Sequence, residues 1–148
     1  MSLKEVKSTR IGDKYFCVEH TSGLRVFVYP KPGFNSTYAI IGAKYGSINT
    51  SFKSLGQSNL TRVPDGIAHY LEHKLFESED GDAFAKYAKT GANANGYTSF
   101  DMTCYLFSCT KNFEDSLKIL LDLVQSPYFT EENVEKERGI IGQEIKMY

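Results

Sequence analysis

Short apolar runs separated by turn residues dominate the first third of the chain. Residues 15–18 and 24–29 are rich in aromatic and β-branched side chains and flank a turn at 21–23, which predicts a β-hairpin. The next run, residues 38–46, is apolar enough for a buried strand. The polar stretch after it, residues 47–61, is typical of a loop. The chain therefore opens with strands.

The middle of the chain changes to helical spacing. Residues 67–76 have helical character, and Asp65 is placed to cap the first turn. A second, shorter helix is predicted over residues 83–89, and Gly91 ends it. Two helices therefore follow the first strands.

A second hairpin and a longer helix come next. Residues 97–99 and 102–109 are again rich in aromatic and β-branched side chains, which predicts two paired strands. From Phe113 onward, apolar residues recur at i, i+4, i+7, i+8 and i+11, the pattern of an amphipathic helix. Asn112 is the candidate cap of this helix, and Pro127 stops it.

A last helix is predicted from Thr130 to the C-terminus. Thr130 is its candidate cap, and the two glutamates that follow are favoured by the helix dipole in the first turn. Strands come first in the chain, followed by hairpins mixed with helices. This order favours an α+β fold, with a mixed, largely antiparallel sheet packed with helices.

Composition and charge narrow the class of protein. The 148 residues, 41% of them hydrophobic and 24% charged, are typical of one soluble globular domain. Seventeen Lys+Arg against eighteen Asp+Glu leave no basic excess that would favour nucleic acid or an anionic membrane. The chain has only three cysteines, no apolar run of a signal peptide and no span of about 18 apolar residues. We therefore expect one cytoplasmic domain over residues 1–148, with no nucleic-acid or membrane partner.

Residues 69–73 read His-Tyr-Leu-Glu-His, the HxxEH pattern that inverts the zinc-binding HExxH motif. On a helix, two histidines four residues apart lie on one face about 6 Å from each other, and Glu72 falls in the same sector. One zinc ion can contact both imidazoles. A histidine pair alone is more typical of a solvated helix face, and a catalytic zinc needs a third protein ligand and an open position.

The last predicted helix offers that third ligand. Its apolar sector contains Val134, Ile140, Ile141, Ile145 and Met147. Glu137 and Glu144 fall within the same stripe, seven residues apart. A lone buried carboxylate carries a large desolvation cost, which a role as a zinc ligand, or as a group that orients a ligating histidine, removes. The alternative is that both are ordinary surface carboxylates.

These features together resemble the pitrilysin or insulinase family of inverted-zincin metallopeptidases. The HxxEH motif is followed, after 70 intervening residues, by Glu144 in the segment 135–145, and residues 91–99 (Gly-Ala-Asn-Ala-Asn-Gly-Tyr-Thr-Ser) lie between them. The similarity runs from about Gly23 to the end and is greatest to bacterial processing-protease-like members. The resemblance implies the fold of the N-terminal domain of pitrilysin-family, mitochondrial-processing-peptidase-like metallopeptidases.

The resemblance also implies a role for each site residue. His69, His73 and Glu144 are expected to bind Zn²⁺, and Glu72 is expected to act as the general base on a zinc-activated water. Glu137 corresponds to a second family glutamate near the site, where we expect it to orient a ligand. The implied function is that of a zinc-dependent endopeptidase that hydrolyses extended peptides.

A substrate strand is also implied by the family pattern. Asn95, Gly96 and Tyr97 match the edge strand on which this family docks extended peptides, which add a strand to the sheet. Taken from the residues alone, the same stretch is also typical of a Gly/Asn-rich turn that leads into an ordinary strand.

Family members act as pairs of homologous domains, which leaves a second interpretation open. The chain is then a non-catalytic homologous partner subunit, or the substrate-presenting half of a two-domain peptidase. A zinc-bearing maturation partner for a ribosomal peptide differs only in its substrate. The family domain is somewhat longer than this chain, so we expect residues 1–148 to be a truncated N-terminal zinc-peptidase domain. It should need a homologous C-terminal half or partner chain, and should be weak or inactive alone.

Overall fold

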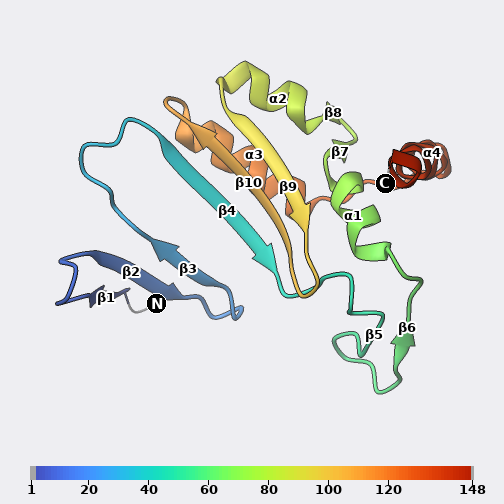
Figure 1. The fold of residues 1–148 in the computed structure, drawn as a ribbon, viewed down its shortest axis with the longest axis horizontal. Helices are drawn as coiled ribbons and strands as arrows, with labels where there is room; N and C mark the ends of the chain where they lie inside the picture. Colours follow the sequence, from blue (N-terminus) through green and yellow to red (C-terminus); the bar gives the residue numbers. More distant parts are fainter. Residues whose placement is uncertain (1–2, 148) are drawn as a thin grey trace. The chain divides into compact units, whose positions relative to one another are not determined.

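Two antiparallel sheets contain most of the strands in the computed structural model, which describes residues 3–147. They belong to separate compact units within Met1–Asn35 and Ser36–Tyr148, and the single domain expected over residues 1–148 stays a prediction. The first unit has the strand order β1-β2-β3 (Figure 1). Its strands are β1 (Leu3–Lys7), β2 (Lys14–Glu19) and β3 (Arg25–Val28). Phe16 pairs with Val28 across β2 and β3, which confirms the predicted hairpin.

The second unit is built on a three-stranded antiparallel sheet in the order β4-β10-β9. Its strands are β4 (Thr37–Ala43), β9 (Asn93–Thr98) and β10 (Thr103–Cys109). Helices pack on one face of this sheet (Figure 1). Tyr105 and Phe107 point into that layer because side chains of a strand alternate between its two faces, and both belong to the hydrophobic core.

Four helices complete the second unit. They are α1 (Ile67–Leu75), α2 (Ala83–Thr90), α3 (Phe113–Gln125) and α4 (Glu131–Met147). The helices predicted over residues 67–76 and 83–89, from Phe113 and after Thr130 are confirmed, and so is the α+β class. Within residues 3–147, no helix combines the length and the hydropathy that a membrane crossing requires.

Two helix starts differ from the predicted caps. α1 begins after Gly66, whose φ of 84° is left-handed, so Gly66 and not Asp65 is the N-cap. Asn112 does precede α3, but it has a φ of 54° and its side chain makes no capping hydrogen bond. Its amide instead donates to the carbonyl of Thr90, the last residue of α2. The predicted cap at Thr130 is confirmed, because its hydroxyl accepts from a backbone N–H of the first turn of α4.

Two predicted loop segments contain strands. β5 (Ser51–Phe52) pairs with β6 (Thr61–Arg62), so the ladder lies largely within the predicted loop over residues 47–61. β9 begins at Asn93 and not at Tyr97, because six of its residues pair with β10. A further short ladder joins β7 (Glu77–Ser78) to β8 (Gly81–Asp82). Backbone pairing therefore extends β structure into Asn- and Gly-rich sequence of low strand propensity.

Two apolar surfaces that were expected to be buried are exposed. On β4, Tyr38 and Ile40 lie on the face of the sheet opposite to the helices. On α4, Ile140, Ile145 and Met147 are exposed as well. The buried residues of α4 within the described part of the chain are the polar Asn133 and Glu137, and the apolar Val134 and Ile141 beside them are half-buried.

The core gives a first prediction about stability. Leu120 of α3 is 1% exposed, so Leu120→Ala should lower the free energy of unfolding by about 2–5 kcal/mol through lost contacts and a cavity. The neighbouring Leu121 is 38% exposed, and Leu121→Ala should cost about 1 kcal/mol or less. Urea unfolding followed by circular dichroism measures both. Equal losses in the two variants would show that α3 does not pack as described.

Candidate functional site

Helix α1 presents the HxxEH residues to a cleft of about 840 Å³. The spacing i, i+3, i+4 places His69, Glu72 and His73 on one side of the helix. Each of them offers one ligand atom, and these atoms lie within 4.8 Å of one another. The two imidazole rings meet edge to face with centroids 4.6 Å apart. The nine-residue helix is therefore sufficient to bring these three side chains together.

Helix α4 brings a further carboxylate to the same point. Glu144 Oε2 lies 3.8 Å from His69 Nε2 and 3.6 Å from His73 Nε2. Around a tetrahedral zinc with bonds of about 2.0–2.2 Å, ligand atoms lie roughly 3.3–3.6 Å apart. Two imidazole nitrogens and one carboxylate oxygen fit zinc in chemistry, and of the two separations from Glu144, 3.6 Å lies at the upper end of this range and 3.8 Å lies slightly beyond it. All three side chains are partly exposed, so the cluster has an open side.

Glu137 lies behind His73 and away from the cluster of ligand atoms. His73 Nδ1 and Glu137 Oε1 are 2.9 Å apart, and the Glu137 side chain is nearly buried. With the carboxylate as acceptor, the imidazole carries its proton on Nδ1 and leaves the Nε2 lone pair free on the side of Glu144. Glu137 is therefore placed to fix the tautomer and the orientation of the ring.

Glu72 has a different environment from the other carboxylates of the site. It is 7% exposed, and burial raises the pKa of its carboxyl, an effect that charge on His73 and His69 opposes. Thr98 on β9 donates a hydroxyl hydrogen bond to Glu72 Oε2 at 3.4 Å. The other carboxylate oxygen of Glu72, Oε1, lies against Gly96, where an added Cβ atom would come within 2.6 Å of it. The carboxylate is thus enclosed between α1 and the backbone of β9.

The segment predicted to bind substrate lies on an edge strand. Asn95, Gly96 and Tyr97 are central residues of β9, and they line the same cleft as the HxxEH residues. β9 pairs with β10 on one side, and within residues 3–147 no strand pairs with its other side. The interpretation of residues 95–97 as a turn is therefore wrong, whereas their role in substrate binding stays a prediction.

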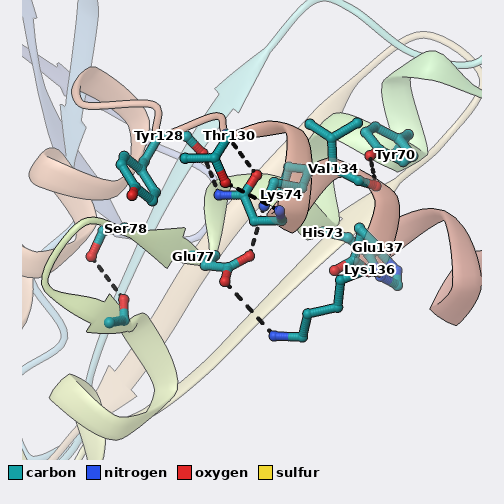
Figure 2. Close-up of polar contacts among 12 residues, drawn as sticks. Tyr70, His73, Lys74, Glu77, Ser78, Tyr128, Thr130, Val134, Lys136 and Glu137 are labelled. Carbon is teal, nitrogen blue, oxygen red and sulfur yellow. Dashed lines mark hydrogen bonds and ion pairs between the residues drawn. The ribbon is translucent and has the colours of Figure 1, made fainter.

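Three residues of this region were not assigned by sequence reasoning. The hydroxyl of Tyr70 donates to the carbonyl of Val134 in α4 at 2.6 Å. Lys74 is fully buried and donates to Glu77 Oε2 at 2.7 Å (Figure 2). The i, i+3 spacing of Lys74 and Glu77 is the one signal that pointed to their pairing. That both lie next to α4 depends on the tertiary structure.

The sequence is similar to proteins described as peptidases. Residues 55–148 match the family described as Insulinase (Peptidase family M16). A relative from Bacillus subtilis (strain 168), named "uncharacterized zinc protease YmfH", is 53% identical over 146 residues, which are 99% of this chain and 34% of that protein. The core protein I of the mitochondrial ubiquinol-cytochrome-c reductase complex of Euglena gracilis is 35% identical over 89 residues, covering 57% of this chain and 18% of that protein. The chain spans about a third of the length of the first of these relatives.

Solved structures agree with the fold. A crystal structure described as that of an M16-like peptidase from Alicyclobacillus acidocaldarius is 41% identical, with a TM-score of 0.83, and the match covers 99% of this chain and 32% of that one. Pitrilysin is 18% identical with a TM-score of 0.73, over 99% of this chain and 16% of that one, a likeness that concerns the fold alone. The α+β fold of the N-terminal domain that the family resemblance implied is therefore confirmed.

Proposed function

The chain belongs to the insulinase family of peptidases, peptidase family M16, and from this membership we propose that it is the zinc-dependent catalytic domain of an endopeptidase that hydrolyses extended peptides. The observation that carries the proposal is the approach of Glu144 to both imidazoles of the HxxEH motif, at 3.6 and 3.8 Å. The name of the Bacillus subtilis relative, a zinc protease, supports the choice of metal.

In this proposal the zinc ion is held by His69, His73 and Glu144, with the open side of the cluster facing the cleft. Zinc, when bound, polarises a peptide carbonyl and lowers the pKa of a coordinated water. Glu137 accepts the Nδ1 hydrogen of His73 and keeps Nε2 on the side of the metal. Because the carboxylate of Glu137 is nearly buried, its hydrogen bond to the ring is little weakened by competing solvent.

Glu72 acts as the general base. It accepts a proton from water on a carboxylate oxygen and later gives that proton to the nitrogen of the leaving amine. Burial raises the pKa of Glu72, which makes its carboxylate a stronger base than an exposed one. The hydroxyl of Thr98 and the backbone at Gly96 limit the rotamers that the side chain can adopt. The base is therefore oriented before substrate arrives.

The peptide binds along β9. Within residues 3–147 no strand pairs with the outer edge of β9, and an extended peptide can add a strand there. Alternate residues of β9 direct their backbone N–H and C=O groups to this edge, and the N–H of Gly96, which donates to Asn95 Oδ1, would exchange that bond for one to the peptide. Asn95, Gly96 and Tyr97 line the cleft that contains Glu72. Backbone hydrogen bonds give affinity with little dependence on sequence, which suits an enzyme acting on varied extended peptides.

A homologous half, on the same chain or on a partner chain, is proposed to close the cleft. The chain spans about a third of its Bacillus subtilis relative, so the whole protein contains more than this unit if it resembles that relative. A second candidate function is that of a non-catalytic homologous subunit. The similarity to a core protein of a respiratory complex favours it. The complete donor set and the enclosed Glu72 favour the peptidase.

Zinc titration and peptide cleavage test the proposal. The purified chain should bind about one zinc, and zinc at 100 times its Kd should raise the free energy of unfolding by about 2.7 kcal/mol. With the homologous half present, a mixture of unfolded peptides should be cleaved, as measured by mass spectrometry. A chelator should stop cleavage, and added zinc should restore it. Peptides that are bound but remain uncut in the presence of zinc would favour the non-catalytic subunit.

A further inference from the structure

Helix α4 carries Glu137 and Glu144, yet apolar packing does little to fix its position. Its two buried residues within the described part of the chain are Asn133 and Glu137, which are both polar. Ile145 and Met147, at the end that carries Glu144, are 69% and 77% exposed. Val134 and Ile141 of α4 are half-buried, but hydrophobic packing is non-directional, so directional polar contacts are needed to set where α4 lies along α1.

The first of these contacts is the hydroxyl of Tyr70. It donates to the backbone carbonyl of Val134 at 2.6 Å (Figure 2). Tyr70 follows the first histidine of the HxxEH motif, and Val134 lies one turn before Glu137. A short hydrogen bond to a backbone atom is directional, so it constrains the position of the helix itself and not only that of a side chain.

The second contact is the ion pair between Glu77 and Lys136, in which the buried Lys74 restrains Glu77. Lys74 is fully buried, and its ammonium donates to Glu77 Oε2 at 2.7 Å, a contact that lowers the pKa of Glu77. A buried ammonium requires such a counter-charge, so Glu77 has little freedom to turn away. Its other oxygen, Oε1, lies 3.7 Å from Nζ of Lys136 on α4 (Figure 2). Lys136 directly precedes Glu137 in the sequence.

In the sequence, Tyr70 and Glu77 flank His73, whereas their partners on α4, Val134 and Lys136, both come within one turn before Glu137. A helix that slides by one residue moves by about 1.5 Å, several times the tolerance of about 0.2 Å in a metal–ligand distance. We propose that Tyr70 and the Glu77–Lys136 pair are positioning contacts that set α4 on α1 and thereby place Glu144 beside the two imidazoles. This inference rests on the proposed zinc site and adds residues that do not touch the metal.

Substitutions at the two contacts separate positioning from folding. Tyr70→Phe removes only the hydroxyl, and Lys136→Gln removes one charge from α4. Arg138→Gln is the matched control, because it removes the same charge from the same helix but breaks a pair with Glu135, which is itself on α4. Zinc affinity is measured by competition with a chromophoric chelator, and the Tm is measured with and without zinc.

Zinc affinity should fall by about 3- to 10-fold in Tyr70→Phe, a factor typical of one hydrogen bond. In Lys136→Gln it should fall by at most about 2- to 5-fold, because the Lys136 side chain is 64% exposed and exposed ion pairs contribute little. Lys136→Arg should restore it, whereas Arg138→Gln should bind zinc as the unsubstituted chain does. A purely structural role would lower the Tm of the zinc-free and zinc-loaded forms equally and leave the zinc Kd unchanged.

Two results would overturn the inference while leaving the proposed function intact. One is unchanged zinc affinity in both Tyr70→Phe and Lys136→Gln. The other is a loss in Arg138→Gln as large as that in Lys136→Gln, which would show that only the overall charge of α4 matters. Failure of the unsubstituted chain to bind zinc would instead contradict the proposed function and this inference together.

Discussion

Glu144→Gln should lower the affinity of the chain for zinc by more than about 100-fold, so that dialysed protein retains no stoichiometric metal. The substitution keeps the shape of the side chain but replaces an anionic oxygen by a neutral amide, a much weaker donor to Zn²⁺. The Glu144 carboxylate lies within 3.8 Å of both imidazole nitrogens, and without it only two protein ligands remain. Metal analysis after dialysis, together with chelator competition, measures the loss.

Other glutamates of α4 supply the comparison. Glu135 is exposed and pairs with Arg138, so Glu135→Gln should bind zinc as tightly as the unsubstituted chain. Glu137→Gln should have an intermediate effect, about 10- to 100-fold, because it only orients His73. If Glu144→Gln retained its zinc, the assignment of the third ligand would be wrong, and Glu137 or Glu72 would have to supply it.

The parts of this site that the sequence predicted are those that local geometry determines. His69, Glu72 and His73 come together because they share one short helix, and any helix with this spacing would place them so. Glu137 and Glu144 could be singled out because the period of α4 puts both in its apolar stripe. That Glu144 meets α1 followed from the family resemblance and not from the period.

The contacts that join α1 to α4 could not be predicted in this way. The tyrosine within HxxEH gives no indication that its hydroxyl will bond to a backbone carbonyl 64 positions further along the chain. The burial of Lys74 contradicts the usual exposure of lysine, and only the neighbouring Glu77 makes it tolerable. The prediction of a buried apolar stripe on α4 was only partly right, since Val134 and Ile141 are half-buried whereas Ile145 is exposed.

The extent of β9 could not be predicted from local sequence either. Asn93 and Asn95 have low strand propensity, and a turn was the natural alternative. In the structure they pair with β10, whose aromatic residues are held in the core, so the central strand imposes extended structure on its neighbour. The low strand propensity of Gly96 does not indicate its role in the structure, which is to leave room for the Glu72 carboxylate.

The roles proposed for Glu144, Glu137 and Glu72 differ because the environments of these three carboxylates differ. Glu144 is partly exposed beside the imidazole nitrogens, which suits a metal ligand in an open site. Glu137 is buried against Nδ1 of His73, which suits a group that orients the ring. Glu72 is enclosed, and burial raises its pKa, which suits a group that exchanges protons. Zinc affinity and hydrolysis should therefore respond differently to the same Glu→Gln change at each position.

Glu72→Gln should retain zinc and lose peptide hydrolysis by at least about 10²- to 10⁴-fold, the usual contribution of a general base. Glutamine keeps the length of the side chain and can still accept the hydrogen bond from Thr98, so the folded site should be preserved. It cannot accept a proton at neutral pH. Hydrolysis is measured as the rate of peptide cleavage with the homologous half present, and zinc content is measured on the same preparation.

Two comparisons test whether a loss of hydrolysis in Glu72→Gln arises from the loss of the general base. Glu135→Gln makes the same chemical change at an exposed site and should cleave peptides at the unsubstituted rate. Peptide affinity should be unchanged in Glu72→Gln, because β9 supplies the binding groups, so the loss should fall on kcat and not on KM. If Glu72→Gln cleaves peptides as fast as the unsubstituted protein, another group must take the proton, and the enclosed carboxylate beside Gly96 is then only structural.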